Sequence, residues 1–243
     1  MADLEFGYSS RCCLTGSVLD VTTEHRFSAT EATGEVSALL MRPKEARCLY
    51  VFGHGAGAGM RHSFMEACAL RLCQRGIATF RYAFPYMEAG RKFPDRAPVL
   101  METVEAALVT ATTLAPELPL FAGGKSMGGR VTSLSASTNK LPRLHGLAFF
   151  GFPLHAAGRD STERGLHLAE VGVPMLFLQG DRDKLANLGF LTALLEGVLP
   201  SPALHVVDGA DHGFHVLKRS GRTDAGVLDE LCDAFSGWVD AVL

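Results

Sequence analysis

The residues best suited to chemistry form a short glycine-rich stretch, Gly124-Lys125-Ser126-Met127-Gly128. An apolar run at 120–122 precedes it, and a stretch compatible with a helix follows it. Gly-x-Ser-x-Gly between a strand and a helix is typical of a nucleophile elbow, a turn so tight that side chains two residues either side of the serine would collide with the strand or the helix. The helix N-terminus behind the serine favours developing negative charge. The pattern predicts that Ser126 is a catalytic nucleophile, against the alternative of a glycine-rich turn with a surface serine.

Two nucleotide-binding motifs match parts of the chain, and both fail on spacing. Gly124-Lys125-Ser126 matches the end of a phosphate-binding P-loop, but that loop requires glycine five residues before Gly124, where this chain has Pro119. The glycines of 53–59 alternate, whereas a dinucleotide fingerprint needs G-x-G-x-x-G and an acidic residue after the next strand, which here runs into Arg81. The sequence therefore indicates no organic cofactor.

A serine hydroxyl is a weak nucleophile and needs a general base within hydrogen-bonding distance. His212 is the candidate, because it lies in the loop after the last apolar run, 204–207. Glycines at 209 and 213 leave that loop free to fold over the sheet. His215 lies three residues further on and is expected to face the helix that follows.

The base in turn needs a buried carboxylate, which orients it and stabilises its protonated form. Asp181 and Asp183 both follow the apolar run 175–178, which fits the chain order of serine, acid and histidine that accompanies this motif. Their spacing alone does not separate them. Asp211 would have to fold its short side chain back onto its neighbour His212, so we do not expect it to be the acid.

Backbone amides are expected to stabilise the oxyanion of the tetrahedral intermediate. One is the N–H of Met127, directly after the serine, and the other comes from the glycine-rich loop 53–59. Within that loop we expect the N–H of Ala56, with Gly55 as the next candidate. His54 is expected to brace the loop rather than to take part in catalysis.

Elements that position these residues can be read from the hydrophobic pattern. Short, continuously apolar runs bounded by Gly, Pro or polar residues are typical of strands buried on both faces. They lie at 49–52, 77–80, 120–122, 147–150, 175–178 and 204–207. Helical spacing of apolar residues is found at 64–72, 100–114 and 227–242. The alternation predicts one α/β domain over 1–243, with a mostly parallel sheet, helices on both faces and an antiparallel edge from two strands within 14–41.

The composition limits the classes of protein to which the chain can belong. The 243 residues are 47% hydrophobic and 20% charged, so a sizeable core can form. A net charge of −3 offers no basic excess for nucleic acid, and no apolar run approaches the roughly 20 residues that span a bilayer. The start of the chain lacks the layout of a signal peptide. The six cysteines, at 12, 13, 48, 68, 73 and 232, form no CxxC pair. We therefore expect them to be reduced thiols and the protein to be cytoplasmic.

Five stretches together resemble the α/β-hydrolase superfamily, near its dienelactone-hydrolase-like branch. They are 54–60, 84–87, 123–130, 179–183 and 210–212. Within this superfamily, the stretches resemble the family that includes testis-expressed protein thirty and the third subunit of the NSL chromatin complex, with many bacterial relatives. The resemblance implies the α/β-hydrolase fold and favours Asp183 over Asp181 as the acid. Ser126 stands where dienelactone hydrolases have cysteine, which argues against assigning their substrate.

The expected function is that of a serine hydrolase, which cleaves an ester or related acyl bond of a small molecule through an acyl-enzyme intermediate. Ser126, Asp183 and His212 would form the triad, and no metal or organic cofactor is implied because water is the second substrate. The alternative is a catalytically idle module that binds a protein partner, as the chromatin-complex relatives suggest. The sequence does not indicate an oligomeric state.

Two features bear on the substrate. The segment 151–172, where related folds insert lids, is short and lacks a long apolar helix, so we expect a shallow, open pocket without a large cap domain. Basic residues near the motif, Arg91, Lys92, Arg96 and Lys125, are expected to be solvated surface, with recognition of an anionic substrate as the alternative.

Overall fold

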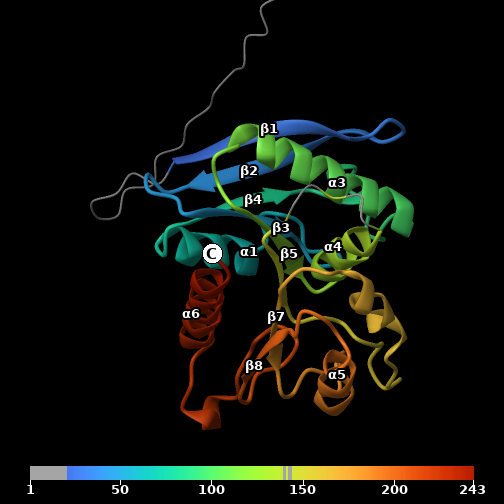
Figure 1. The fold of residues 1–243 in the computed structure, drawn as a ribbon, viewed down its shortest axis with the longest axis vertical. Coiled ribbons are helices and arrows are strands. Elements are labelled where there is room, and N and C mark those ends of the chain that lie inside the picture. Colours follow the sequence, from blue (N-terminus) through green and yellow to red (C-terminus); the bar gives the residue numbers. More distant parts are fainter. Residues whose placement is uncertain (1–20, 139–140, 142–143) are drawn as a thin grey trace, which may run out of the picture.

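One eight-stranded sheet forms the centre of the molecule in the computed structural model, which describes residues 21–138, 141 and 144–243 (Figure 1). The strands lie in the order β1-β2-β4-β3-β5-β6-β7-β8, and all neighbours from β4 to β8 are parallel. Their bounds are β1 Val21–Thr30, β2 Gly34–Arg42, β3 Cys48–Gly53, β4 Ile77–Tyr82, β5 Leu120–Lys125, β6 Gly146–Phe150, β7 Met175–Gly180 and β8 Ala203–Val207. The predicted mostly parallel sheet is confirmed.

The antiparallel edge is confirmed within the described residues. β1 pairs with β2, and β2 pairs with β4, both antiparallel, with the turn between the first two at residues 31–33. The beginning of the expected segment, 14–20, lies outside the described residues.

Five of the six apolar runs form strands that are buried along their whole length, β3 to β7. The sixth prediction is wrong in part. The run 204–207 forms β8, but only Val207 is fully buried, because β8 is an edge strand with β7 as its single neighbour. An apolar run looks the same in sequence whether the strand has one neighbour or two.

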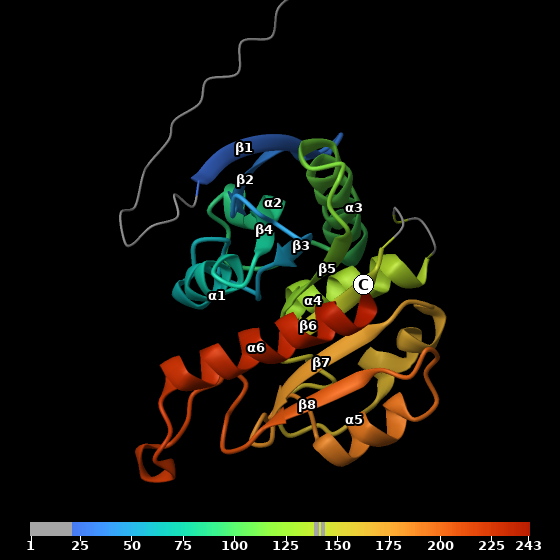
Figure 2. The ribbon, with the colours of Figure 1, turned by 60° about the vertical axis from the view of Figure 1, so that its left-hand side comes forward.

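Helices cover both faces of the sheet, as predicted (Figures 1 and 2). The core on one face includes α1 and α6, which contact each other, and the core on the other includes α3, α4 and α5. The helices are α1 Ser63–Cys73, α2 Pro85–Glu88, α3 Ala97–Leu114, α4 Met127–Ser137, α5 Leu188–Leu195 and α6 Asp224–Val242, with 3₁₀ helices η1 Glu163–Glu170 and η2 Lys218–Ser220.

Among the described helices, α3 alone has the length and apolar composition of a membrane span. Its apolar side, with Leu100, Val104 and Leu108, is buried in the core against the sheet and α4. In all, 33% of the residues of α3 are buried.

Four of the six cysteines lie in the described residues, and all four are buried thiols: Cys48, Cys68, Cys73 and Cys232. Burial raises the pKa of the Cys48 thiol to about 12 and raises that of Cys68 well above its ordinary value. The expectation of thiols holds for these four, and Cys12 and Cys13 lie outside the described residues.

The backbones of β3, β5 and α4 meet without intervening side chains, and this contact positions the serine. A Cβ atom built on Gly128 would lie 2.4 Å from both the carbonyl carbon and oxygen of Gly53. One built on Gly124 would lie 2.4 Å from the same oxygen. Real Cβ atoms do not approach other atoms so closely, so both positions of the motif require glycine for packing.

We therefore expect Gly128→Ala to lower the free energy of unfolding by at least about 3 kcal/mol, the upper range for overpacking, because rigid backbone must move. Gly237→Ala is the matched control: Gly237 is exposed in α6, and its added Cβ would meet nothing within 4 Å. That change should stabilise the protein by about 0.5–1 kcal/mol, since alanine favours a helix. Urea denaturation followed by circular dichroism measures both, and equal stabilities of the two variants would contradict the packing argument.

Candidate active site

Ser126 has a strained backbone, with φ 51° and ψ −116°, in a region that residues with a side chain rarely adopt. It lies between β5 and α4, as the sequence predicts for a nucleophile elbow, and its N–H donates to the carbonyl of Phe150 at 3.1 Å. The tight turn separates the serine from both flanking elements and leaves its side chain on the wall of a pocket.

His212 lies against Ser126. Its Nε2 is 2.8 Å from Oγ of Ser126, and its Nδ1 is 2.7 Å from Oδ2 of Asp183. A carboxylate only accepts, so Nδ1 carries the proton and Nε2 is left to accept from the serine hydroxyl. The side chain of Asp183 is fully buried, whereas that of His212 is 26% exposed. Three residues far apart in sequence therefore form one hydrogen-bonded chain.

Asp183 accepts two further hydrogen bonds, which fix its carboxylate. Leu185 donates its N–H to Oδ1 at 2.7 Å, and Gln179 donates from Nε2 to Oδ2 at 2.5 Å. The oxygen of the Gln179 amide accepts from the N–H of Phe152 at 2.9 Å, which fixes the orientation of the amide. Sequence reasoning missed Gln179. Its signal was a polar residue inside a buried strand, just before the two candidate acids.

The other acidic and histidine candidates have separate partners. Asp181 accepts from the N–H of Gly209 at 2.8 Å and does not contact His212. Asp211 accepts from the amides of Gly213 and His215 within its own loop, at 2.8 and 3.0 Å. His215 faces the start of α6, as expected, with Nδ1 2.7 Å from a carboxylate oxygen of Asp224, and this hydrogen bond raises the pKa of His215.

Two free amides lie near the serine. Met127 is the first residue of α4, and the N–H groups of a first helical turn have no partner within the helix. In the loop after β3, the N–H of Gly57 donates to the Tyr86 hydroxyl and that of Ala58 donates to a carbonyl. The N–H of Ala56, between these and the strand, donates to no acceptor among the described residues.

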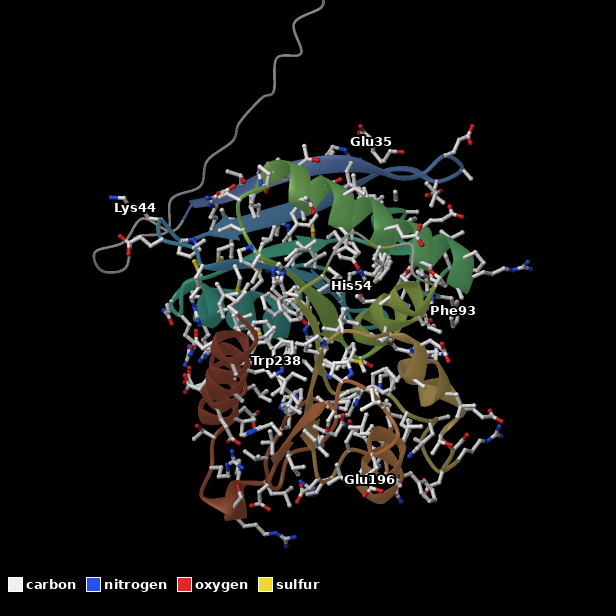
Figure 3. All side chains as sticks on the ribbon, viewed as in Figure 1. Glu35, Lys44, His54, Phe93, Glu196 and Trp238 are labelled. Carbon is white, nitrogen blue, oxygen red and sulfur yellow. The ribbon has the colours of Figure 1, made fainter. Side chains whose placement is uncertain are left out.

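His54 is structural, as expected. It is fully buried, and Figure 3 labels it inside the molecule, in contrast to the exposed Phe93. Its Nε2 accepts from the N–H of Phe84 at 3.2 Å, so Nδ1 donates to the carbonyl of Gly55 at 2.7 Å. Burial lowers the pKa of His54 to about 4, which keeps the ring neutral. The loop after β3 is thereby tied to the segment after β4.

The pocket beside Ser126 has a volume of about 820 Å³. Its apolar lining includes residues of α1, α6 and the loop after β8, among them Phe64, Met65, Ala67, Phe214 and Leu228, together with Ala56, Ala58 and Leu185 from the loops after β3 and β7. Polar groups that also line it are His62, Arg71, His215 and Asp224. No residue of 151–172 lines this pocket, which agrees with the predicted absence of a large cap. Within the described part of the chain, no three His, Cys, Asp or Glu side chains gather as a metal site requires.

The basic residues near the motif divide into two groups. Arg91, Lys92 and Arg96 are exposed and do not line the pocket, as expected for solvated surface. For Lys125 the expectation is wrong: only 9% of the residue is exposed, and it lines the pocket. Its Nζ donates to the carbonyl of His212 at 2.6 Å. The position of Lys125 next to Ser126 in the sequence does not indicate the direction in which its long side chain extends.

Several solved structures share this fold. A dienelactone hydrolase from Anabaena variabilis ATCC 29413 has a TM-score of 0.70 and 19% identity, covering 89% of this chain and 96% of that chain. A serine hydrolase homologue from Coxiella burnetii has a TM-score of 0.69 and 20% identity, covering 87% and 95%. A serine hydrolase without a lid from Xanthomonas campestris has a TM-score of 0.66 and 18% identity, covering 88% and 94%.

No curated protein sequence matches the chain. The finer resemblance, to the family of testis-expressed protein thirty and the third NSL subunit, is not confirmed by these comparisons and stays a prediction. A family model described as alpha/beta hydrolase domain matches residues 46–240, which include every residue of the candidate site. The chain belongs to the alpha/beta hydrolase family.

Proposed function

We propose that the protein is a serine hydrolase, with Ser126 as nucleophile, His212 as general base and Asp183 as the residue that orients His212. The observation that carries this proposal is the hydrogen-bonded chain, with 2.8 Å between Oγ of Ser126 and Nε2 of His212 and 2.7 Å between Nδ1 and Asp183. These distances suit proton transfer without rearrangement. The similarity of the fold to a serine hydrolase homologue from Coxiella burnetii and to a serine hydrolase from Xanthomonas campestris supports the same proposal.

In the first half of the reaction, Oγ of Ser126 attacks the carbonyl carbon of the acyl substrate while Nε2 of His212 takes the hydroxyl proton. The carbonyl oxygen becomes an oxyanion, which the N–H groups of Met127 and Ala56 stabilise. His212, now protonated and paired with Asp183, gives its proton to the leaving group. The products of this half are the free alcohol and Ser126 carrying the acyl group as an ester.

In the second half, water takes the place of the alcohol. His212 removes a proton from the water, whose oxygen attacks the acyl carbon, and the same two amides hold the second oxyanion. Collapse of this intermediate returns the proton to Oγ of Ser126 and releases the carboxylic acid. Water is the second substrate, so this chemistry calls for no metal or organic cofactor.

We propose a small-molecule ester or related acyl compound as substrate, with an apolar group that binds in the pocket between α1 and α6. Phe64, Met65 and Leu228 line the pocket and would contact such a group. We further propose the cytoplasm as the site of action, on the basis of the cysteine usage.

The proposal predicts that Ser126 reacts with an uncharged alkyl fluorophosphonate at neutral pH. An ordinary serine is inert to this probe, whereas one paired with a base and facing two free amides attacks it. Ser126→Ala and His212→Ala should each abolish labelling and lower esterase kcat by as much as about 10⁶-fold, since triad residues act as a unit. Intact-protein mass spectrometry with peptide mapping measures the labelling.

Lys184→Met serves as a control, because Lys184 is exposed and does not line the pocket, so its labelling should equal that of wild type. The fold of each variant is checked by circular dichroism. Folded wild-type protein that stays unmodified and hydrolyses no activated ester would contradict the enzyme proposal. It would favour the alternative, an idle module that binds a protein partner.

The choice of acid predicts a sharp difference between two similar substitutions. Asp183→Asn should lower kcat by about 10⁴-fold, as the comparable change does in a serine protease, because an amide does not stabilise the required tautomer and imidazolium. Asp181→Asn should retain kcat near wild type, since Asp181 contacts the amide of Gly209 and not His212. Steady-state hydrolysis of p-nitrophenyl butyrate compares the two, and the reverse order of losses would assign the role to Asp181.

A further inference from the structure

Lys125 precedes the nucleophile and has a buried ammonium group that the mechanism above does not use. Its Nζ donates to the backbone carbonyl of His212 at 2.6 Å. The ammonium also lies 5.7 Å from the ring centroid of Phe64 and 5.1 Å from that of Phe214, within the range of cation–π attraction. Burying a lysine is costly unless its charge is compensated, so these contacts call for an explanation.

The backbone of His212 has few other restraints. Among the described residues, the bond from Lys125 is the only hydrogen bond made by its carbonyl, and its N–H donates to no protein acceptor. The loop is also held by the Asp211 carboxylate, by backbone hydrogen bonds of Asp211 with Phe214 and His215, and by Asp224 at Val216. Among the described residues, Lys125 makes the one hydrogen bond to the peptide groups of His212 itself.

Gly151, the residue directly after β6, leaves room for this bond. A Cβ atom built there would lie 3.0 Å from Nζ of Lys125 and 3.4 Å from the carbonyl oxygen of His212. Its φ of 69° is also one that glycine adopts without strain. The segment after β6 thus leaves the space that lets the side chain of Lys125 reach the loop of His212.

We propose that Lys125 is a positioning residue for the hydrolase reaction: its ammonium holds the backbone of His212 so that the imidazole stays within reach of Ser126. One segment of chain then carries both the nucleophile and the group that aligns its base. The inference rests on the proposed function and adds to it a residue outside the triad. An active wild type with an unaffected lysine variant would overturn the inference alone, whereas an inactive wild type would overturn the proposed function.

The charge of Lys125 makes the contact sensitive to pH. Burial lowers the pKa of its ammonium to about 8, although Asp183 and Asp211 oppose this shift. His215, from the same loop as His212, also senses the charge of Lys125. Below pH 8 the ammonium donates a charge-assisted hydrogen bond, which is about twice as strong as a neutral one. Above pH 8 the neutral amine holds the loop less firmly.

Lys125→Met tests the proposal, because methionine keeps most of the apolar stem and removes the donor. On p-nitrophenyl butyrate, a neutral ester, we expect kcat to fall by about 10²-fold, the loss that a displacement of about 1 Å in a catalytic group can cause. KM should stay within about twofold, since methionine keeps most of the apolar stem with which Lys125 lines the pocket. Lys184→Met is the matched control and should keep both constants, because that lysine is exposed and does not line the pocket.

A second substrate, the mono-p-nitrophenyl ester of succinic acid, separates positioning from substrate binding. Under the proposal Lys125→Met lowers kcat equally for the neutral and the anionic ester. A rise in KM confined to the anionic ester, with kcat on the butyrate unchanged, would show that Lys125 binds a substrate carboxylate and would overturn the proposal. Wild-type kcat on the butyrate in the variant would overturn it as well.

The pH profile of the wild type needs no variant and covers the case in which Lys125→Met fails to fold. After subtraction of spontaneous hydrolysis, wild-type kcat should decline as pH rises through about 8, where the ammonium is lost. Folded Lys125→Met should lack this decline and stay at its lower level. A level wild-type profile from pH 7 to 9.5 would overturn the inferred pH sensitivity, and an equal decline in folded Lys125→Met would overturn the proposal.

Discussion

The contact between two backbones, Gly128 of α4 and Gly53 of β3, is the constraint on which the site depends. No side chain fits between them, and Gly124 of β5 lies against the same carbonyl. With strand and helix this close, the single residue that joins β5 to α4 must turn sharply, and Ser126 takes a positive φ. Such strain costs of order 1–3 kcal/mol and persists because the surrounding core over-determines it. The same contact brings the loop after β3, with Ala56, beside the start of α4.

From this fixed serine, hydrogen bonds run inward through groups of decreasing exposure. His212 is partly exposed, Asp183 has a buried side chain, and Gln179 is fully buried within β7. This series of hydrogen bonds ends on the N–H of Phe152, a buried residue two positions after β6. Every hydrogen-bond acceptor in this series therefore has a donor. Within the series, only the hydrogen bond between His212 and Ser126 faces the pocket. This arrangement suits a base that must gain and lose a proton while the groups bonded to it keep their positions.

The parts of the site that could be predicted from the sequence are those marked by a local sequence pattern. Ser126 has glycines at fixed offsets, and the loops of Asp183 and His212 follow apolar runs in the expected order. The choice between Asp181 and Asp183 needed the family resemblance, because two residues after one strand can reach different partners. Lys125 and Gln179 depend on where a side chain points after folding, and spacing does not report this. Gln179 stands in a buried strand, and Lys125 follows a run that reads as apolar.

Adjacent residues at the end of β5 have different tasks in this arrangement, and the elbow explains why one segment can carry both. Lys125 is the last residue in the strand and extends toward Phe64 and Phe214, whereas Ser126 is in the turn. Both reach His212, one at its backbone carbonyl and the other at its ring. Under the proposal above, a histidine held at both points by a single stretch of chain would keep its register with Ser126. The glycines that fix the elbow would then also fix the alignment of His212.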